Sequence, residues 1–179
     1  MLEIDEILFS HARIQHKIKT DLAAKTSLMA KKFRNPLFIC VMDGAIHFFS
    51  DLTRYLSIPA EYGFLRAKSY EGSESAGNVE ITCMENISVF GRVVFLVEDI
   101  IDTGRTIVKV REKLFDLGAD IVYIISLLSK PSRRLLEFKD IRIDVLGWEI
   151  PDKFVIGYGL DYNNKFRNLP YIASLKEIS

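Results

Sequence analysis

The stretch VVFLVEDIIDTGRT, Val93–Thr106, determines the fold and the chemistry of this chain. Its first five residues form a continuous apolar run, which is typical of a strand buried on both faces of a sheet. Acidic side chains follow at once, and Asp-Thr-Gly-Arg-Thr then leads into a segment with apolar residues at helical spacing. Ligands of open α/β sheets bind beyond the carboxyl ends of the strands. The stretch therefore predicts a strand, a ligand-binding turn and a helix, in that order.

The turn after this strand has the features of a phosphate site. A helix N-terminus offers backbone N–H groups without partners and the positive end of the helix dipole. Gly104 allows the backbone to approach a phosphate closely, and Thr103, Arg105 and Thr106 stand beside it. The chain contains neither GxxxxGK[ST] nor GxGxxG, the two most familiar phosphate-binding patterns. We therefore expect a phosphate at Thr103–Thr106.

The acids before the turn indicate that the ligand is more than a phosphate. Glu98, Asp99 and Asp102 would repel a phosphate if all of them faced it. Carboxylates accept hydrogen bonds from sugar hydroxyls, and one or two of them commonly help to hold Mg²⁺ on a phosphate substrate. In an isolated Asp-Thr-Gly, Asp102 or Thr103 would more simply be a helix N-cap. The complete string favours a ribose 5-phosphate site.

Apolar patterns elsewhere predict an α/β fold with a mainly parallel sheet flanked by helices. Strands are expected at Leu37–Met42, about Glu61–Ala67, Val79–Met84, Arg92–Val97, Asp120–Leu127, Ile141–Leu146, Phe154–Tyr158 and Tyr171–Leu175. Helices are expected at about Glu6–Lys32, at Ala45–Leu56 and at Ile107–Leu117, with Gly118 ending the last one. The segment Lys68–Glu80 is rich in Ser, Gly and Glu and is expected to be a loop that acts as a lid.

Length and charge restrict the class of protein. The 179 residues suit one domain, residues 1–179, with a core at about residues 34–150 and the two terminal regions packed as a small cap. Lys+Arg and Asp+Glu both number 24, so no global basic field is expected to bind nucleic acid or an anionic membrane. No apolar stretch approaches the roughly 20 residues of a membrane span. With Cys40 and Cys83 in apolar runs and expected to be buried and reduced, we expect a cytoplasmic enzyme.

At this point the sequence resembles a known family. The string VFLVEDIIDTGRT is similar to the phosphoribosyl pyrophosphate motif of type I phosphoribosyltransferases. Lys68-Ser69-Tyr70, Ser129-Lys130 and the string Trp148–Tyr171 resemble the hypoxanthine-guanine branch most. The resemblance implies the type I fold with a hood built from the chain termini. It also implies transfer of the phosphoribosyl group to hypoxanthine and/or guanine, giving IMP or GMP and pyrophosphate, with Mg²⁺ and in a homodimer or homotetramer.

The resemblance also implies a role for each matching residue. Asp102 matches the proposed general base, and Glu98 and Asp99 match the acids that bind the ribose hydroxyls. With Asp161, these two acids are the implied Mg²⁺ ligands. The other matches are Thr103, Gly104, Arg105 and Thr106 for the 5′-phosphate, Lys130 for the purine 6-oxo group, Phe154 for stacking on the base, Val155 for the base edge, Arg167 for pyrophosphate, and Ser69 and Tyr70 for the lid.

One turn departs from the family pattern. Val41–Ala45 reads VMDGA, and Asp43 stands where family members often carry lysine or asparagine. An acid there would repel pyrophosphate unless a metal or Arg167 compensates, although the backbone around Gly44 is still expected to bind it.

Bland alternatives and two rival functions remain open. Taken alone, Lys130 suits a solvated surface position and Phe154 a core position. One rival function is a phosphoribosyltransferase for xanthine or a pyrimidine. The other is a non-enzymatic regulator that senses phosphoribosyl pyrophosphate.

Overall fold

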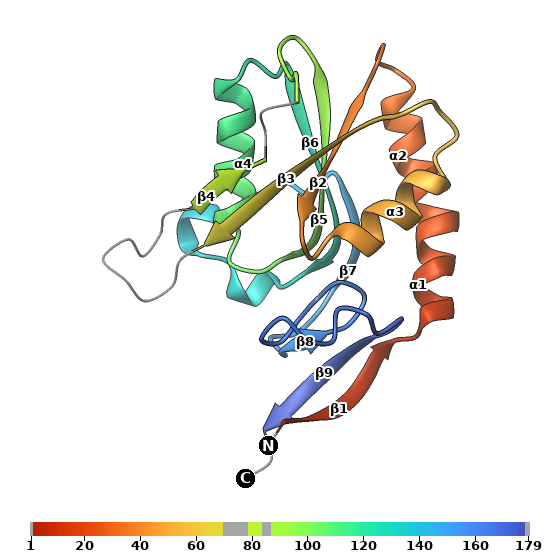
Figure 1. Ribbon diagram of the computed structural model, residues 1–179, viewed down its shortest axis with the longest axis vertical. Coiled ribbons are helices and arrows are strands. Elements are labelled where there is room, and N and C mark those ends of the chain that lie inside the picture. Colours follow the sequence, from red (N-terminus) through yellow and green to blue (C-terminus); the bar gives the residue numbers. More distant parts are fainter. Residues whose placement is uncertain (1, 70–78, 84–86, 178–179) are drawn as a thin grey trace.

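The main sheet of the protein is mostly parallel. A computed structural model describes residues 2–69, 79–83 and 87–177. Six strands lie in the order β4-β3-β2-β5-β6-β7 (Figure 1). Their bounds are Leu37–Met42 for β2, Glu61–Ser69 for β3, Val79–Thr82 for β4, Val93–Ile101 for β5, Ile121–Ser129 for β6 and Val145–Glu149 for β7. Every neighbouring pair is parallel except β3 and β4. The expected α/β fold is confirmed.

Two apolar cores lie on opposite faces of this sheet. Helix α4, Arg105–Asp116, covers one face, and α3, Ile46–Arg54, lies with the N-terminal helices on the other (Figure 1). Alternation along the central strands divides their side chains between the cores. Phe38 and Phe95 stack in the core beneath α3, with ring centroids 4.9 Å apart, whereas Leu96 packs in the core with α4. This double coverage explains why the central strands are continuous apolar runs.

A second, antiparallel sheet joins the two ends of the chain. Strand β1, Leu2–Phe9, pairs with β9, Ile172–Glu177, which pairs with β8, Val155–Ile156 (Figure 1). The expected hood from the chain termini is therefore confirmed. The expectation of a helix from about Glu6 was wrong, because pairing with a strand more than 160 residues away overrides the local apolar pattern.

The N-terminal helix begins at His11. The side chain of the preceding residue, Ser10, caps it by accepting a hydrogen bond from the Arg13 backbone N–H at 3.4 Å. It runs through α1, His11–Lys17, a π-helical segment η1, Ile18–Leu22, and α2, Ala23–Ala30. No helix in the described parts of the chain is long and apolar enough to cross a membrane.

Several boundaries differ from expectation, and one difference affects the site. Strand β5 continues to Ile101 because β6 pairs with it as far as Ser129, so Glu98 and Asp99 lie within the strand. Strand β7 begins at Val145, since the Asp144 carboxylate accepts the Ile124 backbone N–H at 2.9 Å just before it. Two short 3-10 turns, η2, Pro131–Arg133, and η3, Leu136–Phe138, separate β6 from β7.

The expected lid segment, Lys68–Glu80, begins in β3 and ends in β4. Lys68 and Ser69 belong to β3, and Val79 and Glu80 belong to β4. Tyr70 and the remaining lid residues lie outside the described residues, as does Met84.

Cys40 is buried as expected. The same expectation for Cys83 was wrong, because this residue follows the short outer strand β4 and is exposed.

Candidate active site

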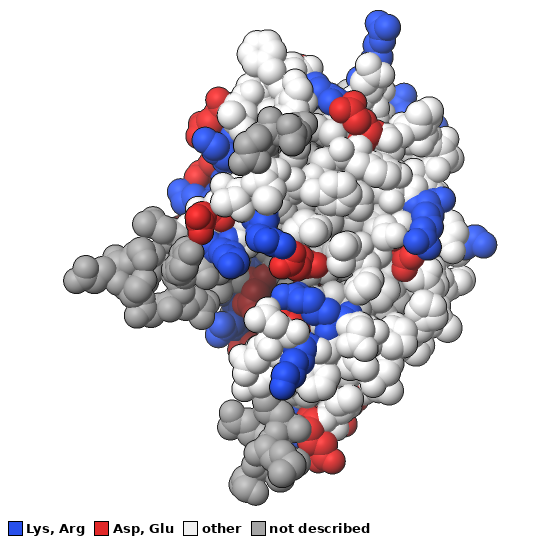
Figure 2. Space-filling view, viewed as in Figure 1, with Lys and Arg blue, Asp and Glu red and all other residues white. Residues whose placement is uncertain are grey.

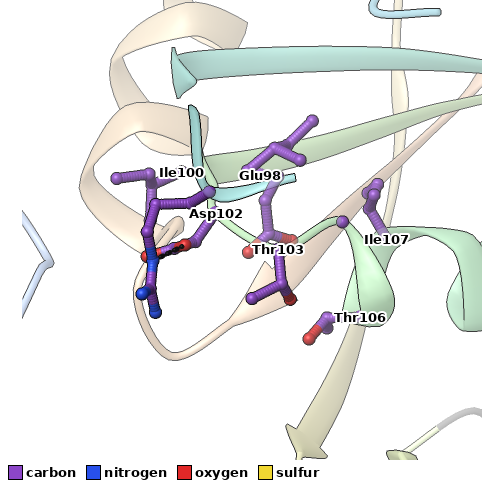
Figure 3. A pocket seen from close by; sticks show the side chains of 9 residues that line it. Glu98, Ile100, Asp102, Thr103, Thr106 and Ile107 are labelled. Carbon is purple, nitrogen blue, oxygen red and sulfur yellow. Dashed lines mark hydrogen bonds and ion pairs between the residues drawn. The ribbon is translucent and has the colours of Figure 1, made fainter. Parts of the chain in front are cut away.

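The turn between β5 and α4 forms a small, polar cavity. Gly104 has a left-handed conformation, φ 89°, and precedes the first residue of α4. Gly104 offers no side chain to cap this helix N-terminus, and the first turn of α4 holds no acid. A cavity of about 160 Å³ lies against the turn, lined by Glu98, Asp102, Thr103, Gly104, Thr106 and Arg133 among others (Figure 3). The free backbone N–H groups make this cavity suitable for an anion.

Five of the residues expected around the sugar phosphate therefore meet at this cavity: Glu98, Asp102, Thr103, Gly104 and Thr106. Arg105 begins α4 and is not among the lining residues; its backbone N–H donates to Thr103 Oγ1 at 3.4 Å. Thr103 and Thr106 lie on the same side of the turn (Figure 3). This arrangement leaves the Arg105 side chain outside the cavity.

A larger cavity of about 500 Å³ adjoins the first. Its lining includes Asp99, Asp102, Lys130, Phe154, Val155 and Asp161. Pockets of this size commonly hold small organic ligands. Asp102 and Arg133 line both cavities, so the two form one cleft with a polar junction. Figure 2 shows acidic side chains deep in a hollow between the main sheet and the small sheet, with basic side chains around its rim.

Asp102 accepts contacts from two cations at this junction. Its Oδ2 lies 3.3 Å from Lys130 Nζ, and its Oδ1 lies 3.1 Å from Arg133 Nε. Asp152 Oδ1 stands farther out, 3.9 Å from Lys130 Nζ and 3.7 Å from Arg133 Nε. Lys130 is only 6% exposed, so the solvated-surface alternative for this lysine was wrong. Sequence reasoning missed Arg133 and Asp152, although the basic pair that follows Lys130 was a usable signal.

Glu98 and Asp99 form a carboxyl pair, in which Asp99 is buried and Glu98 is partly buried. Burial raises the pKa of both groups, and the neighbouring Asp99 charge raises the pKa of Glu98 further. The pKa of Asp99 is raised less, because other contacts oppose the effect of burial. Asp99 accepts hydrogen bonds from Glu98 and from the Ile100 backbone N–H, and the positive charge of Arg167 also lowers its pKa. Glu98 Oε2 is buried and has no hydrogen-bond partner among the described residues. An unpartnered buried oxygen of this kind favours a ligand that supplies a donor or a cation.

The turn after β2 packs tightly against this carboxyl pair. A Cβ on Gly44 would lie 1.9 Å from Asp99 Oδ2, and a Cβ on Gly159 would lie 1.9 Å from the Gly44 carbonyl oxygen. Only glycine fits at either position without displacing the turn. Arg167 holds Gly159 from behind, since its Nη1 donates to the Gly159 carbonyl oxygen at 2.5 Å. Its Nη2 pairs with Asp161 Oδ1 at 2.7 Å.

Asp43 has a compensating cation that the sequence did not indicate. Arg66 Nη2 lies 2.7 Å from Asp43 Oδ1. The expectation named a metal or Arg167 for this task, but Arg167 pairs with Asp161 instead. Arg66 reaches Asp43 because β3 lies parallel to β2, with Arg66 opposite Met42 in the register. Strand register is invisible in a sequence pattern, which explains the omission.

Phe154 lies at the mouth of the larger cavity and is 51% exposed, so the core alternative for it was wrong. Its ring meets Tyr162 edge to face, with centroids 5.5 Å apart. The Phe154 carbonyl oxygen accepts the Leu175 backbone N–H at 2.9 Å, and Val155 is buried in β8. The small sheet thus fixes the backbone beneath Phe154 and leaves its ring accessible to a ligand.

The fold and this cleft define a phosphoribosyltransferase. A model of the phosphoribosyl transferase domain matches residues 8–163, and the chain belongs to that family. Its similarity is to the hypoxanthine-guanine members. The chain is 41% identical over 175 residues to the hypoxanthine-guanine phosphoribosyltransferase of Bacillus subtilis, covering 97% of this chain and 94% of the relative.

Two further relatives extend the comparison. The chain is 34% identical to the hypoxanthine-guanine-xanthine phosphoribosyltransferase of Tritrichomonas foetus, covering 99% of this chain and 94% of that protein. It also superposes on a crystal structure of a hypoxanthine-guanine phosphoribosyltransferase from Bacillus anthracis with a TM-score of 0.86 and 32% identity. That superposition covers 98% of this chain and 100% of the other.

Proposed function

We propose that this enzyme transfers the phosphoribosyl group of phosphoribosyl pyrophosphate to hypoxanthine and/or guanine, giving IMP or GMP and pyrophosphate. One observation carries the proposal: Asp102 lies where the small cavity at the α4 N-terminus meets the larger cavity of Lys130 and Phe154. A ligand that fills both would place an anionic group at α4 and a flat ring beside Phe154. A purine nucleoside 5′-monophosphate has this shape.

In this proposal, the residues of the larger cavity select and activate the base. Phe154 offers a flat ring for a flat purine. The Lys130 ammonium is a donor only, so it suits a 6-oxo acceptor and not a 6-amino donor. When Lys130 contacts the base, its hold on Asp102 weakens, and the Asp102 carboxylate is then able to accept the ring proton of the purine. The Val155 backbone faces the edge of the base.

The acids and the glycine turn act on the sugar and the leaving group. Departure of pyrophosphate leaves cationic character on the ribose, and the carboxylates of Glu98 and Asp99 would stabilise it. The same two carboxylates would accept hydrogen bonds from the ribose hydroxyls. Mg²⁺, which the carboxyl oxygens of Glu98, Asp99 and Asp161 suit, would neutralise charge on the pyrophosphate. No group of three or more His, Cys, Asp or Glu in the described residues is arranged to hold a metal alone, so substrate oxygens would complete its coordination. The Asp43-Gly44 backbone and Arg167 would bind the pyrophosphate.

A base panel tests this function. Purified enzyme with phosphoribosyl pyrophosphate and Mg²⁺ is offered hypoxanthine, guanine, xanthine, adenine, uracil and orotate, and nucleotide formation is followed by chromatography. We expect turnover of hypoxanthine and/or guanine above all others. Xanthine belongs in the panel because the relative from Tritrichomonas foetus is named a hypoxanthine-guanine-xanthine phosphoribosyltransferase. Turnover of uracil or orotate alone would overturn the purine assignment.

Replacing Lys130 by alanine is expected to weaken the preference for 6-oxopurines over adenine. The variant removes the donor that suits the 6-oxo group, and a hydrogen bond to a charged donor contributes about 1.5–3 kcal/mol. The ratio of kcat/KM for hypoxanthine to that for adenine should therefore fall by more than about tenfold. Lys139→Ala, which changes an exposed lysine after η3, serves as the control. An unchanged ratio in the Lys130 variant would assign this contact to another group.

We propose a homodimer or homotetramer, which the exposed aromatic side chains of Tyr62 and Phe64 on β3 support. Light scattering coupled to gel filtration tests this assembly, and a monomeric mass would contradict it.

We propose a cytoplasmic location, since the proposed substrates are intracellular nucleotide precursors. Fractionation of the source cells tests this location.

A further inference from the structure

A half-buried arginine that the proposed chemistry does not use lies beneath the phosphate-binding turn. Arg134 follows η2 and donates from Nη2 to Ser129 Oγ at 2.9 Å. Its Nη1 is buried and has no hydrogen-bond partner within the residues that the structure describes. A guanidinium remains charged in proteins, and leaving one of its donors unpaired in the interior is unfavourable. Such a group requires an explanation from its surroundings.

The surroundings of Nη1 point to the turn between β5 and α4. A Cβ on Gly104 would lie 3.4 Å from Arg134 Nη1, so the guanidinium stands directly behind the glycine backbone. The next residue is tied to the same turn, because the Leu135 backbone N–H donates to the Thr103 carbonyl oxygen at 3.1 Å. Phe138 packs against Gly104 from the same side. The segment 134–138 therefore supports the turn from beneath.

Arg134 differs from Arg133 in its distance from the nearest carboxylates. Arg133 pairs with Asp102 at 3.1 Å. Arg134 has no carboxylate within ion-pair distance in the described chain, although the more distant Asp102 and Glu149 act on it. Burial lowers the pKa of Arg134, and these two carboxylates raise it only in part. The N-terminus of α4 lies at the same turn. Two independent sources of positive potential thus act on one small cavity.

We propose that Arg134 is a positioning residue for the 5′-phosphate: it packs behind the Gly104 backbone and adds a partly buried positive charge there. This inference rests on the proposed function, because it assigns the anion at this turn to a ribose 5-phosphate. A partly buried charge acts more strongly than a fully solvated one, since water screens it less. The neighbouring Ser129 hydroxyl fixes the guanidinium in this orientation. Arg134 consequently sets the preference for phosphorylated over unphosphorylated ribosyl ligands.

The test compares a nucleotide with its nucleoside by titration calorimetry. Arg134→Met removes the charge and keeps much of the side-chain volume. We expect IMP to bind at least about tenfold more weakly to this variant, while the affinity for inosine stays within about twofold. Arg134→Lys keeps the charge and should bind IMP more tightly than Arg134→Met does. Arg142→Met changes an exposed arginine of the η3–β7 connection and should leave both affinities unchanged.

The outcomes that overturn the proposal are distinct. Equal loss of IMP and inosine binding in Arg134→Met would indicate a merely structural role, and unchanged IMP binding would remove Arg134 from the phosphate site. If Arg134→Met does not fold, Ser129→Ala deletes the hydroxyl partner of Arg134 and should weaken the binding of IMP more than that of inosine. If Ser129→Ala causes no such selective loss, the proposal is overturned. Ribose 5-phosphate and ribose, tested in parallel, carry no base. They report on Arg134 even if the base panel contradicts the proposed function.

Discussion

Replacing Asp102 by asparagine is expected to lower turnover with hypoxanthine by about 10²- to 10⁴-fold, the usual effect of removing a general base. Asparagine keeps the size of the side chain but cannot take up the ring proton of the purine. IMP binding should be largely retained, because asparagine has nearly the shape of Asp102 and the α4 N-terminus and Phe154 are unchanged. Steady-state kinetics and calorimetric titration of IMP measure the two effects separately.

The surroundings of Asp102 determine the controls for this variant. Lys130 is buried and loses its nearer carboxylate in Asp102→Asn, so part of any loss could arise from destabilisation. The free energy of unfolding is therefore measured for each variant. Asp116→Asn, at the far end of α4, makes the same chemical change at an exposed site and should leave turnover unchanged. Near-normal turnover in Asp102→Asn would exclude Asp102 as the base.

Replacing Gly44 by alanine is expected to damage both the fold and the site. The new Cβ would lie 1.9 Å from Asp99 Oδ2, so either the turn or the buried carboxylate must move. Overpacking of this kind costs about 1–3 kcal/mol of stability. Because both Asp99 and the turn are placed by this contact, we also expect kcat/KM for phosphoribosyl pyrophosphate to fall by about tenfold or more. Urea unfolding and initial-rate kinetics measure the two effects.

A second glycine provides the comparison for Gly44→Ala. Gly91 has φ 66°, and a Cβ there would meet no heavy atom of the described residues within 4 Å. Gly91→Ala should therefore introduce only backbone strain of about 1 kcal/mol and leave kinetics unchanged. Wild-type stability and kinetics in Gly44→Ala would show that the Asp99 contact is not constraining.

The reach of sequence reasoning differed between the two sheets. The apolar runs of β2, β5 and β6 identified these central strands of the main sheet, because both of their faces are buried and local composition records that burial. Strand β1 was missed because its partner, β9, lies at the opposite end of the chain. Its strand conformation depends on that pairing, which no local window of sequence contains.

The same division applies to the site. By itself the sequence determined the strand, turn and helix of Val93–Thr106, because acids, glycine and hydroxyls at the end of an apolar strand leave few chemical interpretations. Only the tertiary structure decided which charges meet there. It paired Asp43 with Arg66, brought Lys130 and Arg133 onto Asp102, and placed Arg134 beneath Gly104. These contacts depend on strand register and on the path of the chain after β6, and distance along a sequence does not encode either.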